Sequence, residues 1–407
     1  MTDELTAKAT YGQVFAVAQF RAIFAGRLLG VMSDSLRSVA LALVVFSQTR
    51  SPLLTAVAMT IGFLPQAVGG MFLSAMADWF PPRTLISAGY ALQCAAGLLI
   101  ATGRLPVGVS LLLVAAVACL TPVATGASAR FLAEVLTGDT YVLGRSLSYL
   151  VAVSAQMAGM AVGGALTEQL GADRMILVTA GGHLLASVIS GLFLSRAGAA
   201  RAGRPAVAGG SIVRKTFQGN AALAAAPGVA RLITVCSLPY AYLAAAGSLL
   251  IPYSAHRAFS PAETGALLAA ISAGMLAGDV AVGLAFAPAT RERLVLPLLL
   301  GMGIPAITLV LDLPYPAVVA AYVITGTGSA YLLGLQQRLL EAVPPGLQGQ
   351  GFALLNTATM TLQGIGPLVF GGLAEFLPAG LAIALTGVSS VTTTLLLRHA
   401  IRPRTPS

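Results

Sequence analysis

Charged residues are scarce in this sequence. Only 9% of its 407 residues are charged, whereas 57% are hydrophobic, and the mean hydropathy is +0.87. Soluble domains carry about 25% charged residues, so this chain has too few charges to cover its surface in water. The scarcity excludes a soluble globular protein and indicates a membrane protein, in which lipid surrounds most side chains.

Residues that commonly bind metals or catalyse reactions are also rare. The three cysteines lie in apolar stretches without CxxC spacing, and the three histidines are far apart and form no HExxH motif. No GxxxxGK[ST] phosphate loop occurs, and no Ser-His-Asp order surrounds a nucleophile elbow. We therefore expect no metal, no cofactor and no enzymatic activity.

The basic residues are not gathered on one face. The formal charge is +9, but the basic residues are scattered between apolar segments rather than clustered among aromatic ones, which argues against nucleic acid as a partner. The segment 1–10 has no short cleavable apolar core, so no signal peptide is predicted and the first helix itself directs insertion.

Long hydrophobic runs fill the rest of the chain. The 45 glycines and 22 prolines suit membrane helices, where small residues allow close backbone contact. Turn residues and charges divide the chain into twelve segments of about 20 residues, which predicts an all-α integral membrane protein with twelve transmembrane helices. The segments are expected at roughly 20 to 46, 54 to 76, 85 to 102, 107 to 130, 146 to 168, 174 to 196, 229 to 255, 263 to 286, 293 to 311, 315 to 339, 351 to 373 and 379 to 398.

The longest polar stretch divides these helices into two sets of six. It predicts an N-terminal half at 1–196, a cytoplasmic linker at 197–228 and a C-terminal half at 229–407. The segments Gly159–Gly171 and Gly366–Gly380 resemble each other and carry Glu168 and Glu375 after paired glycines. Such similarity is typical of two related halves around a central cavity.

Arginine and lysine in the short loops predict the orientation. With the N-terminus inside, the outer loops hold only Arg50, Arg104, Arg174 and Arg257, and the remaining loop cations fall on the cytoplasmic side. We expect a monomer in a bacterial inner membrane with both termini in the cytoplasm, and a bilayer, protons and a small molecule as its partners.

The first predicted helix and its loop resemble a known transporter family. Phe20 and Arg21 at its start, Asp34 within it, and Ser51 with Pro52 after it resemble major facilitator exporters of the enterobactin and macrolide efflux branch. Glu341–Gly372 resembles a later loop and the eleventh helix of the same branch. The matches follow the family's order along nearly the whole chain, which implies the major facilitator fold, with two six-helix halves and a central cavity.

The segment Gly69–Ile86 looks like the signature loop of that superfamily. Asp78 and Arg83 match its acid and its basic turn. The resemblance implies a gating loop in which Asp78 accepts hydrogen bonds from the start of the eleventh helix. Arg130 and Glu134, four residues apart, either join this cluster or form an exposed pair.

Ionisable residues inside a membrane are expensive and indicate function by default. Arg27, Asp34 and Arg37 lie along one side of the first helix, because spacings of three and seven return to one face. Asp34 is either part of a structural ion pair with Arg27 or Arg37, or the protonatable group that couples transport to protons. Asp279, surrounded by small residues, is the second candidate for coupling, with a structural role as the alternative.

Uncharged polar and aromatic groups within the predicted helices are candidates for the cavity lining, with hydrogen bonding between helices as the alternative. They are Gln66, Gln93, Gln156, Tyr240, Tyr242, Tyr331, Gln336, Asn356 and Gln363. Pro239 precedes two of them and predicts a kinked seventh helix.

Few deep charges and apolar helices favour a hydrophobic or amphiphilic substrate over a highly charged one. The sequence and its resemblance predict a secondary active exporter of a drug, secondary metabolite or siderophore, driven by proton antiport with alternating access. Proton-coupled uptake of a small nutrient is the alternative, and a receptor without transport activity is a third.

Overall fold

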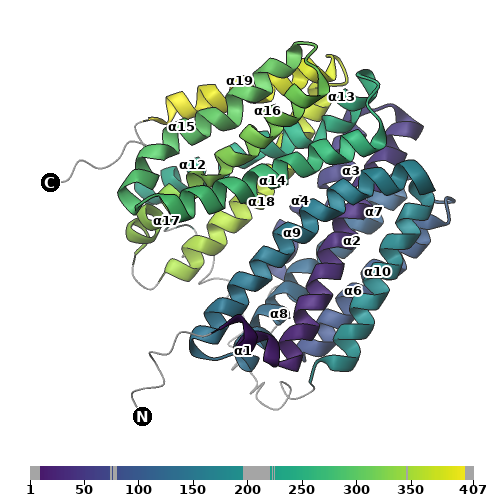
Figure 1. The fold of residues 1–407 in the computed structure, drawn as a ribbon, viewed down its shortest axis with the longest axis vertical. Coiled ribbons are helices and arrows are strands. Elements are labelled where there is room, and N and C mark those ends of the chain that lie inside the picture. Colours follow the sequence, from purple (N-terminus) through teal and green to yellow (C-terminus); the bar gives the residue numbers. More distant parts are fainter. Residues whose placement is uncertain are drawn as a thin grey trace. The chain divides into compact units, whose positions relative to one another are not determined.

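The computed structural model describes residues 10–73, 76, 80–195, 221, 223, 225–344 and 347–398, and these ranges contain helices and connecting turns but no strand (Figure 1). In chain order the helices are α1 (Tyr11–Ala16), α2 (Ala18–Thr49), α3 (Pro52–Thr60), α4 (Phe63–Phe72), α6 (Pro82–Ala101), α7 (Val107–Ala118), α8 (Thr121–Val135), α9 (Gly138–Leu170), α10 (Ala172–Phe193), α12 (Pro227–Ser248), α13 (Leu250–His256), α14 (Pro261–Ala285), α15 (Pro288–Ile307), η2 (Thr308–Val310), α16 (Tyr315–Thr327), η3 (Gly328–Ala330), α17 (Tyr331–Ala342), α18 (Gln348–Leu373) and α19 (Ala379–Leu396).

Helices occupy all twelve predicted segments. In the described ranges, ten segments are long and apolar enough to cross a membrane, and α3 with α4 forms one more span bent by 40°. The 26 residues of α18 make the twelfth helix; at 1.5 Å per residue it is about 39 Å long, enough to cross a hydrocarbon core of about 30 Å.

Several predicted helices are broken near a proline. The second, fourth and seventh are interrupted before Pro65, Pro122 and Pro252, each of which lies in the first turn of the following helix. A first-turn residue needs no partner for its backbone N–H, so proline is tolerated there but not in the preceding turn. Pro239, in contrast, lies inside α12.

The described chain falls into two compact units. Unit 1 comprises residues 1–41 and 68–206, and unit 2 comprises 42–67 and 207–407. The predicted halves follow the chain order instead, and they remain a prediction. Most of the predicted linker, 197–228, lies outside the described residues.

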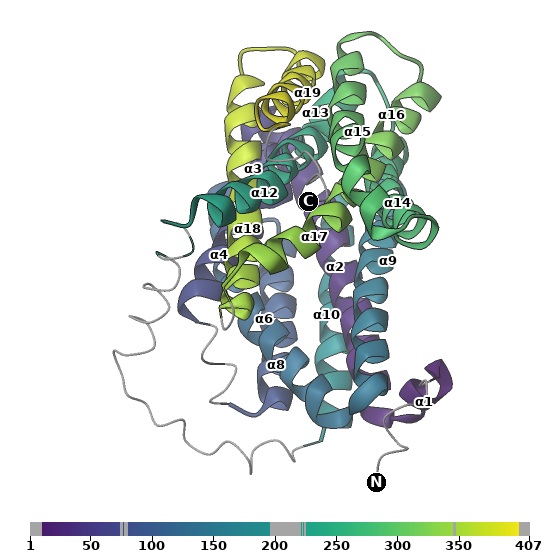
Figure 2. The same cartoon turned by 90° about the vertical axis from the view of Figure 1, so that its left-hand side faces the viewer.

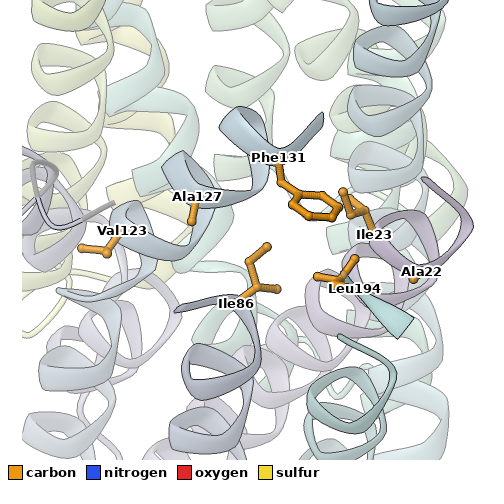
Figure 3. Packing of buried hydrophobic residues seen from close by; sticks show 7 residues of the cluster. All are labelled: Ala22, Ile23, Ile86, Val123, Ala127, Phe131 and Leu194. Carbon is orange, nitrogen blue, oxygen red and sulfur yellow. The ribbon is translucent and has the colours of Figure 1, made fainter. Parts of the chain in front are cut away.

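Hydrophobic packing at one end of unit 1 fixes the orientation of α8. Val123, Ala127 and Phe131 recur every four residues on one face of this helix and are buried against Ile23 and Ile86 (Figure 3). Since these positions take up one face, residues such as Thr125 and Ser128 lie on another. Figures 1 and 2 also show α6 and α10 of this unit side by side.

Small residues bring α14 and α16 of unit 2 into direct backbone contact. A Cβ atom at Gly274 would meet the backbone of Val323, and one at Gly278 would meet that of Thr327. Glycines four residues apart let membrane helices approach closely, where dispersion and weak hydrogen bonds replace the missing hydrophobic drive. Figure 1 shows the two helices along each other.

A glutamate distant in sequence caps the N-terminus of α3. The Ser51 side chain accepts a hydrogen bond from the backbone N–H of Leu54 (3.0 Å), and Glu375 Oε1 accepts one from that of Leu53 (2.9 Å) and another from the Ser51 hydroxyl. In α14, Ser260 and Glu263 make the equivalent cap within one helix. The position that Glu263 occupies in α14 is occupied by Leu54 in α3. Glu375 therefore provides the acid that α3 lacks at its own N-terminus.

We predict that Glu375→Ala exposes the start of α3. Loss of an N-terminal cap costs about 1 kcal/mol, so hydrogen exchange of the backbone amides at 53–56 should accelerate about fivefold. The measurement is exchange by mass spectrometry in detergent. Glu263→Ala is the matched control and should accelerate exchange at the start of α14 only; unchanged exchange at 53–56 in Glu375→Ala would contradict the assigned cap.

Candidate functional site

Asp34 connects three helices of unit 1. Its Oδ1 accepts a hydrogen bond from Nη2 of Arg37 at 2.8 Å and lies 3.1 Å from Nε2 of His183 on α10. The other terminal nitrogen of Arg37 donates to the side-chain oxygen of Gln93 on α6. Arg37, His183 and Gln93 are all buried, so Asp34 and these three residues, the Asp34 cluster, form a continuous polar network between α2, α6 and α10.

The Asp34 cluster lies near the middle of a span. Asp34 is 16 residues after the start of α2 and 15 before its end, which places it about 24 and 22 Å from the two ends at 1.5 Å per residue. A charge at this depth costs at least about 2.5 to 3.5 kcal/mol unless it is paired. The ion pair with Arg37 offsets that cost, because removing either charge would leave the other uncompensated.

His183 has one partnered and one unpartnered ring nitrogen. Within the described residues, Nδ1 is buried and makes no hydrogen bond, whereas Nε2 faces the Asp34 carboxylate. With Asp34 charged, the tautomer that carries its hydrogen on Nε2 donates to the carboxylate and leaves only a lone pair unsatisfied at Nδ1. Among the described residues, the ring of His183 is therefore held by a hydrogen bond through Nε2 alone.

Glycines allow the helices of the Asp34 cluster to approach each other. The ring of Tyr90 on α6 packs against Gly30, where a Cβ atom would overlap it, and a Cβ at Gly182 would overlap the Ser33 hydroxyl. A Cβ at the neighbouring Gly181 would meet nothing within 4 Å. Gly182 thus sets the distance between α10 and α2 beside His183.

The Asp34 carboxylate opens into a cavity of about 100 Å³. Although Asp34 is central in its helix, 41% of its side chain is accessible, and the accessible part faces this space. Four helices, α2, α6, α7 and α8, and the residue Leu120 between the last two contribute the lining: Arg27, Gly30, Val31, Asp34, Ile86, Gly89, Tyr90, Leu92, Gln93, Val117, Leu120, Thr121, Ala124, Thr125 and Ser128. The cavity combines apolar walls with a few polar groups, as small-molecule sites do.

Arg27 has a different partner from the one that helical spacing suggests. Its Nε donates to the backbone carbonyl of Ser148 on α9 at 2.9 Å, and Asp34 pairs with Arg37 instead.

Asp279, the second predicted coupling acid, is half-buried on α14 in unit 2 and forms no hydrogen bond or ion pair with any described residue. The structure therefore gives Asp34, but not Asp279, a polar network.

Of the predicted gating residues, Asp78 lies outside the described residues. Arg83 is in the first turn of α6 and half-buried. Arg130 on α8 donates to the Phe80 carbonyl at 3.0 Å and forms an ion pair with Glu134 at 3.7 Å. The gating role of these four residues remains a prediction.

The predicted cavity-lining residues lie in different environments. Gln93 lines the cavity beside Asp34. Tyr331 is fully buried and its hydroxyl donates to the Cys236 carbonyl, so it offers no surface to a ligand here. The side chains of Gln156, Gln336 and Asn356 are exposed, and those of Gln66, Tyr240, Tyr242 and Gln363 are half-buried.

Solved structures share this architecture. No family model matches the sequence, and no curated protein matches it. A bacterial homologue of the human lysosomal transporter Spinster, in an inward-facing and unoccupied conformation, aligns with a TM-score of 0.67 at 14% identity over 97% of both chains. A mutant of the nucleoside transporter NupG aligns with a TM-score of 0.74 at 12% identity, over 94% of this chain and all of that one.

The xylose transporter XylE from E. coli, in its inward-open conformation, aligns with a TM-score of 0.67 at 14% identity over 95% of both chains. The chain has the major facilitator fold. This confirms the predicted fold class of twelve transmembrane helices. The three neighbours are transporters; at such identity the likeness concerns the fold alone.

We predict that Asp34 and Arg37 are energetically coupled. Asp34→Asn and Arg37→Gln should each destabilise the protein, because each leaves a charge without its partner. The double variant should lose less than the sum of the two, with a coupling free energy of about 1 to 2 kcal/mol. Reversible unfolding in mixed detergent micelles measures all four proteins, and additive effects would show that the pair contributes nothing.

We also predict that Gly182→Val disrupts the Asp34 cluster whereas Gly181→Val does not. The new side chain at 182 would displace Ser33 and separate His183 from Asp34, while that at 181 enters open space. The apparent melting temperature in detergent should fall by several degrees for the first variant only. Equal melting temperatures for the two variants would be inconsistent with close contact between α10 and α2 at Gly182.

Proposed function

We propose that this protein is a secondary active transporter that exports a hydrophobic or amphiphilic small molecule in exchange for protons. The observation that carries the proposal is the Asp34 carboxylate, held by Arg37 and His183 in the middle of a span and open to a cavity. An ionisable group with access to an interior cavity is what proton coupling requires. The fold that the chain shares with transporters supports a transport role.

Protonation of Asp34 provides a route from proton binding to helix movement. A proton on the carboxylate removes the negative charge that holds Arg37 and weakens the contact with His183. Because these partners connect α2 to α6 and α10, their release loosens the packing of α2. Proton binding thus favours a different arrangement of the helices, as population shift by a ligand requires.

The cavity supports an amphiphilic rather than a highly charged substrate. Its walls include Val31, Leu92, Val117 and Leu120, and Arg27 is its only basic lining residue among those described. A phosphorylated sugar would require several converging cations. The resemblance of the first helix and its loop to exporters supports export as the direction of transport. Proton-coupled uptake is the alternative, and the experiment below distinguishes the two.

The setting of this function is part of the same proposal. Loop arginines support cytoplasmic termini in a bacterial inner membrane, and the scattered basic residues argue against a nucleic-acid partner. We propose that the protein acts there as a monomer, with the lipid bilayer, protons and its substrate as its partners.

Inside-out membrane vesicles energised by respiration test the proposal. The probes are a dansyl-labelled fatty acid and the same molecule with its carboxyl group converted to a primary amide. A proton antiporter should accumulate at least one probe in the vesicle lumen and reduce the pH gradient as it does so. Vesicles without the protein provide the baseline, and a probe that leaves preloaded vesicles together with protons would indicate symport.

We predict that Asp34→Asn abolishes the dependence of accumulation on the pH gradient, because an amide takes up no proton. Downhill exchange of the probe should continue. Asp312→Asn is the matched control: this acid also pairs with an arginine, Arg257, but its side chain is 92% exposed, and its variant should behave as the wild type. Gradient-driven accumulation with unchanged pH dependence in Asp34→Asn would refute the coupling role.

A further inference from the structure

Arg27 presents unused donors to the cavity. Its Nε is committed to the Ser148 carbonyl, whereas its two terminal nitrogens make no hydrogen bond or ion pair with any residue the structure describes. These nitrogens are accessible to a ligand, since Arg27 lines the cavity and is half-buried. A guanidinium in a membrane span without a carboxylate is costly and calls for a partner from outside the chain.

Tyr90 supplies a second free donor beside it. Its ring packs on Gly30, one turn along α2 from both Arg27 and Asp34, so its hydroxyl reaches the stretch of cavity between them. Within the described part of the chain this hydroxyl makes no hydrogen bond. A carboxylate has two acceptor oxygens, and it matches a guanidinium fork together with a neighbouring hydroxyl.

The charges around the cavity leave one positive charge unmatched. Asp34 lines the cavity but is already paired with Arg37, which lies behind it. Arg27 therefore remains as the cation that no described carboxylate neutralises. A ligand with one negative charge would balance it, whereas a cationic ligand would be repelled by Arg27 and would compete with Arg37 for Asp34.

The size and walls of the cavity define the rest of the ligand. A space of about 100 Å³ accommodates a head group but not a drug-sized molecule, whose sites measure about 300 to 1,000 Å³. Val31 and Leu92 present apolar surface beside Arg27 and Tyr90. The polar group of the ligand fits inside, and its apolar body extends beyond.

We infer that Arg27 and Tyr90 form a subsite for the carboxylate head group of an amphiphilic organic acid. The inference rests on the proposed function, whose substrate class it narrows to molecules with an apolar body and one carboxylate. Arg27 binds the anion, Tyr90 donates a further hydrogen bond, and the apolar wall receives the first carbons of the chain.

Equilibrium binding to the purified full-length protein in a neutral detergent tests the subsite. The dansyl-labelled fatty acid should bind at least about tenfold more tightly than its primary amide, since a hydrogen bond to a charged group is stronger than one to a neutral group. In Arg27→Gln this preference should vanish while binding of the amide is unchanged. Equal affinities of acid and amide for the wild type would overturn the inference.

Two further variants keep the test decisive. Arg21→Gln is the matched control, because Arg21 lies on the same helix and also donates to backbone carbonyls, but it does not line the cavity; its preference for the acid should be that of the wild type. Tyr90→Phe should lose part of the preference. If Arg27→Gln fails to fold, as shown by lost binding of the amide, Arg27→Lys and Tyr90→Phe decide, and a full preference for the acid in both would overturn the inference.

An anionic lipid carries a similar negative head group and provides the last comparison. Phosphatidylglycerol added to the micelles should not displace the fatty acid from the wild type, and displacement that depends on Arg27 would assign the subsite to lipid instead. Binding requires no gradient, so its outcome is independent of transport. Proton-driven accumulation of a probe in vesicles without a binding preference for the acid would contradict the subsite alone. A binding preference for the acid without accumulation of either probe would contradict the proposed function alone.

Discussion

The contact of Asp34 with Arg37 and His183 is the constraint on which the arrangement of unit 1 depends. It places an ion pair near the middle of a span, where either charge alone would cost several kcal/mol. The pair is satisfied only while α6 supplies Gln93 and α10 supplies His183. The close approach at Gly30 and Gly182 follows from this requirement, because a side chain at either position would separate the helices that carry the partners.

The same packing leaves one side of Asp34 uncovered. The hydrophobic face of α8, with Val123 and Phe131, is buried against α2 and α6 (Figure 3), so the positions that carry Thr125 and Ser128 line the space beside Asp34. The cavity is therefore not a packing fault. The cavity arises because α8 carries its buried apolar residues on one face and its polar residues on another.

The sequence predicted the features that depend on local order along the chain. Hydrophobic length and the positions of proline and glycine indicated all twelve spans. Spacings of seven and three indicated Arg27 and Arg37 as possible partners of Asp34 but did not decide between them; the structure pairs Asp34 with Arg37. His183 was missed, because its contact with Asp34 joins residues 149 positions apart and spacing within one helix carries no information about another helix. Its one signal is an ionisable side chain in the middle of the apolar run of α10.

Long-range contacts also explain the other differences. Arg27 bonds a carbonyl of α9 rather than the acid on its own face, a choice that depends on which helix is adjacent. Residues 42–67 group with unit 2, where Glu375 caps α3 and Gly371 meets Leu53. The only local sign that the acid of the α3 cap comes from a distant segment is that residue 54 is leucine rather than glutamate or glutamine. Cavity lining depends in the same way on neighbours: of two glutamines on apolar helices, Gln93 lines a cavity and Gln336 is exposed.

One helix carries both groups to which a function is assigned. Arg27 and Asp34 are seven residues apart on α2, which is about 10.5 Å, or nearly two turns, along one side. A shift of α2 moves them together, because a hydrogen-bonded helix transmits displacement along its axis. Protonation that weakens the contacts of Asp34 with His183 on α10 and with Arg37 therefore also changes the position of Arg27 in the cavity. Proton and ligand can be linked through the body of this helix without touching each other, which is the physical requirement for coupling between two sites.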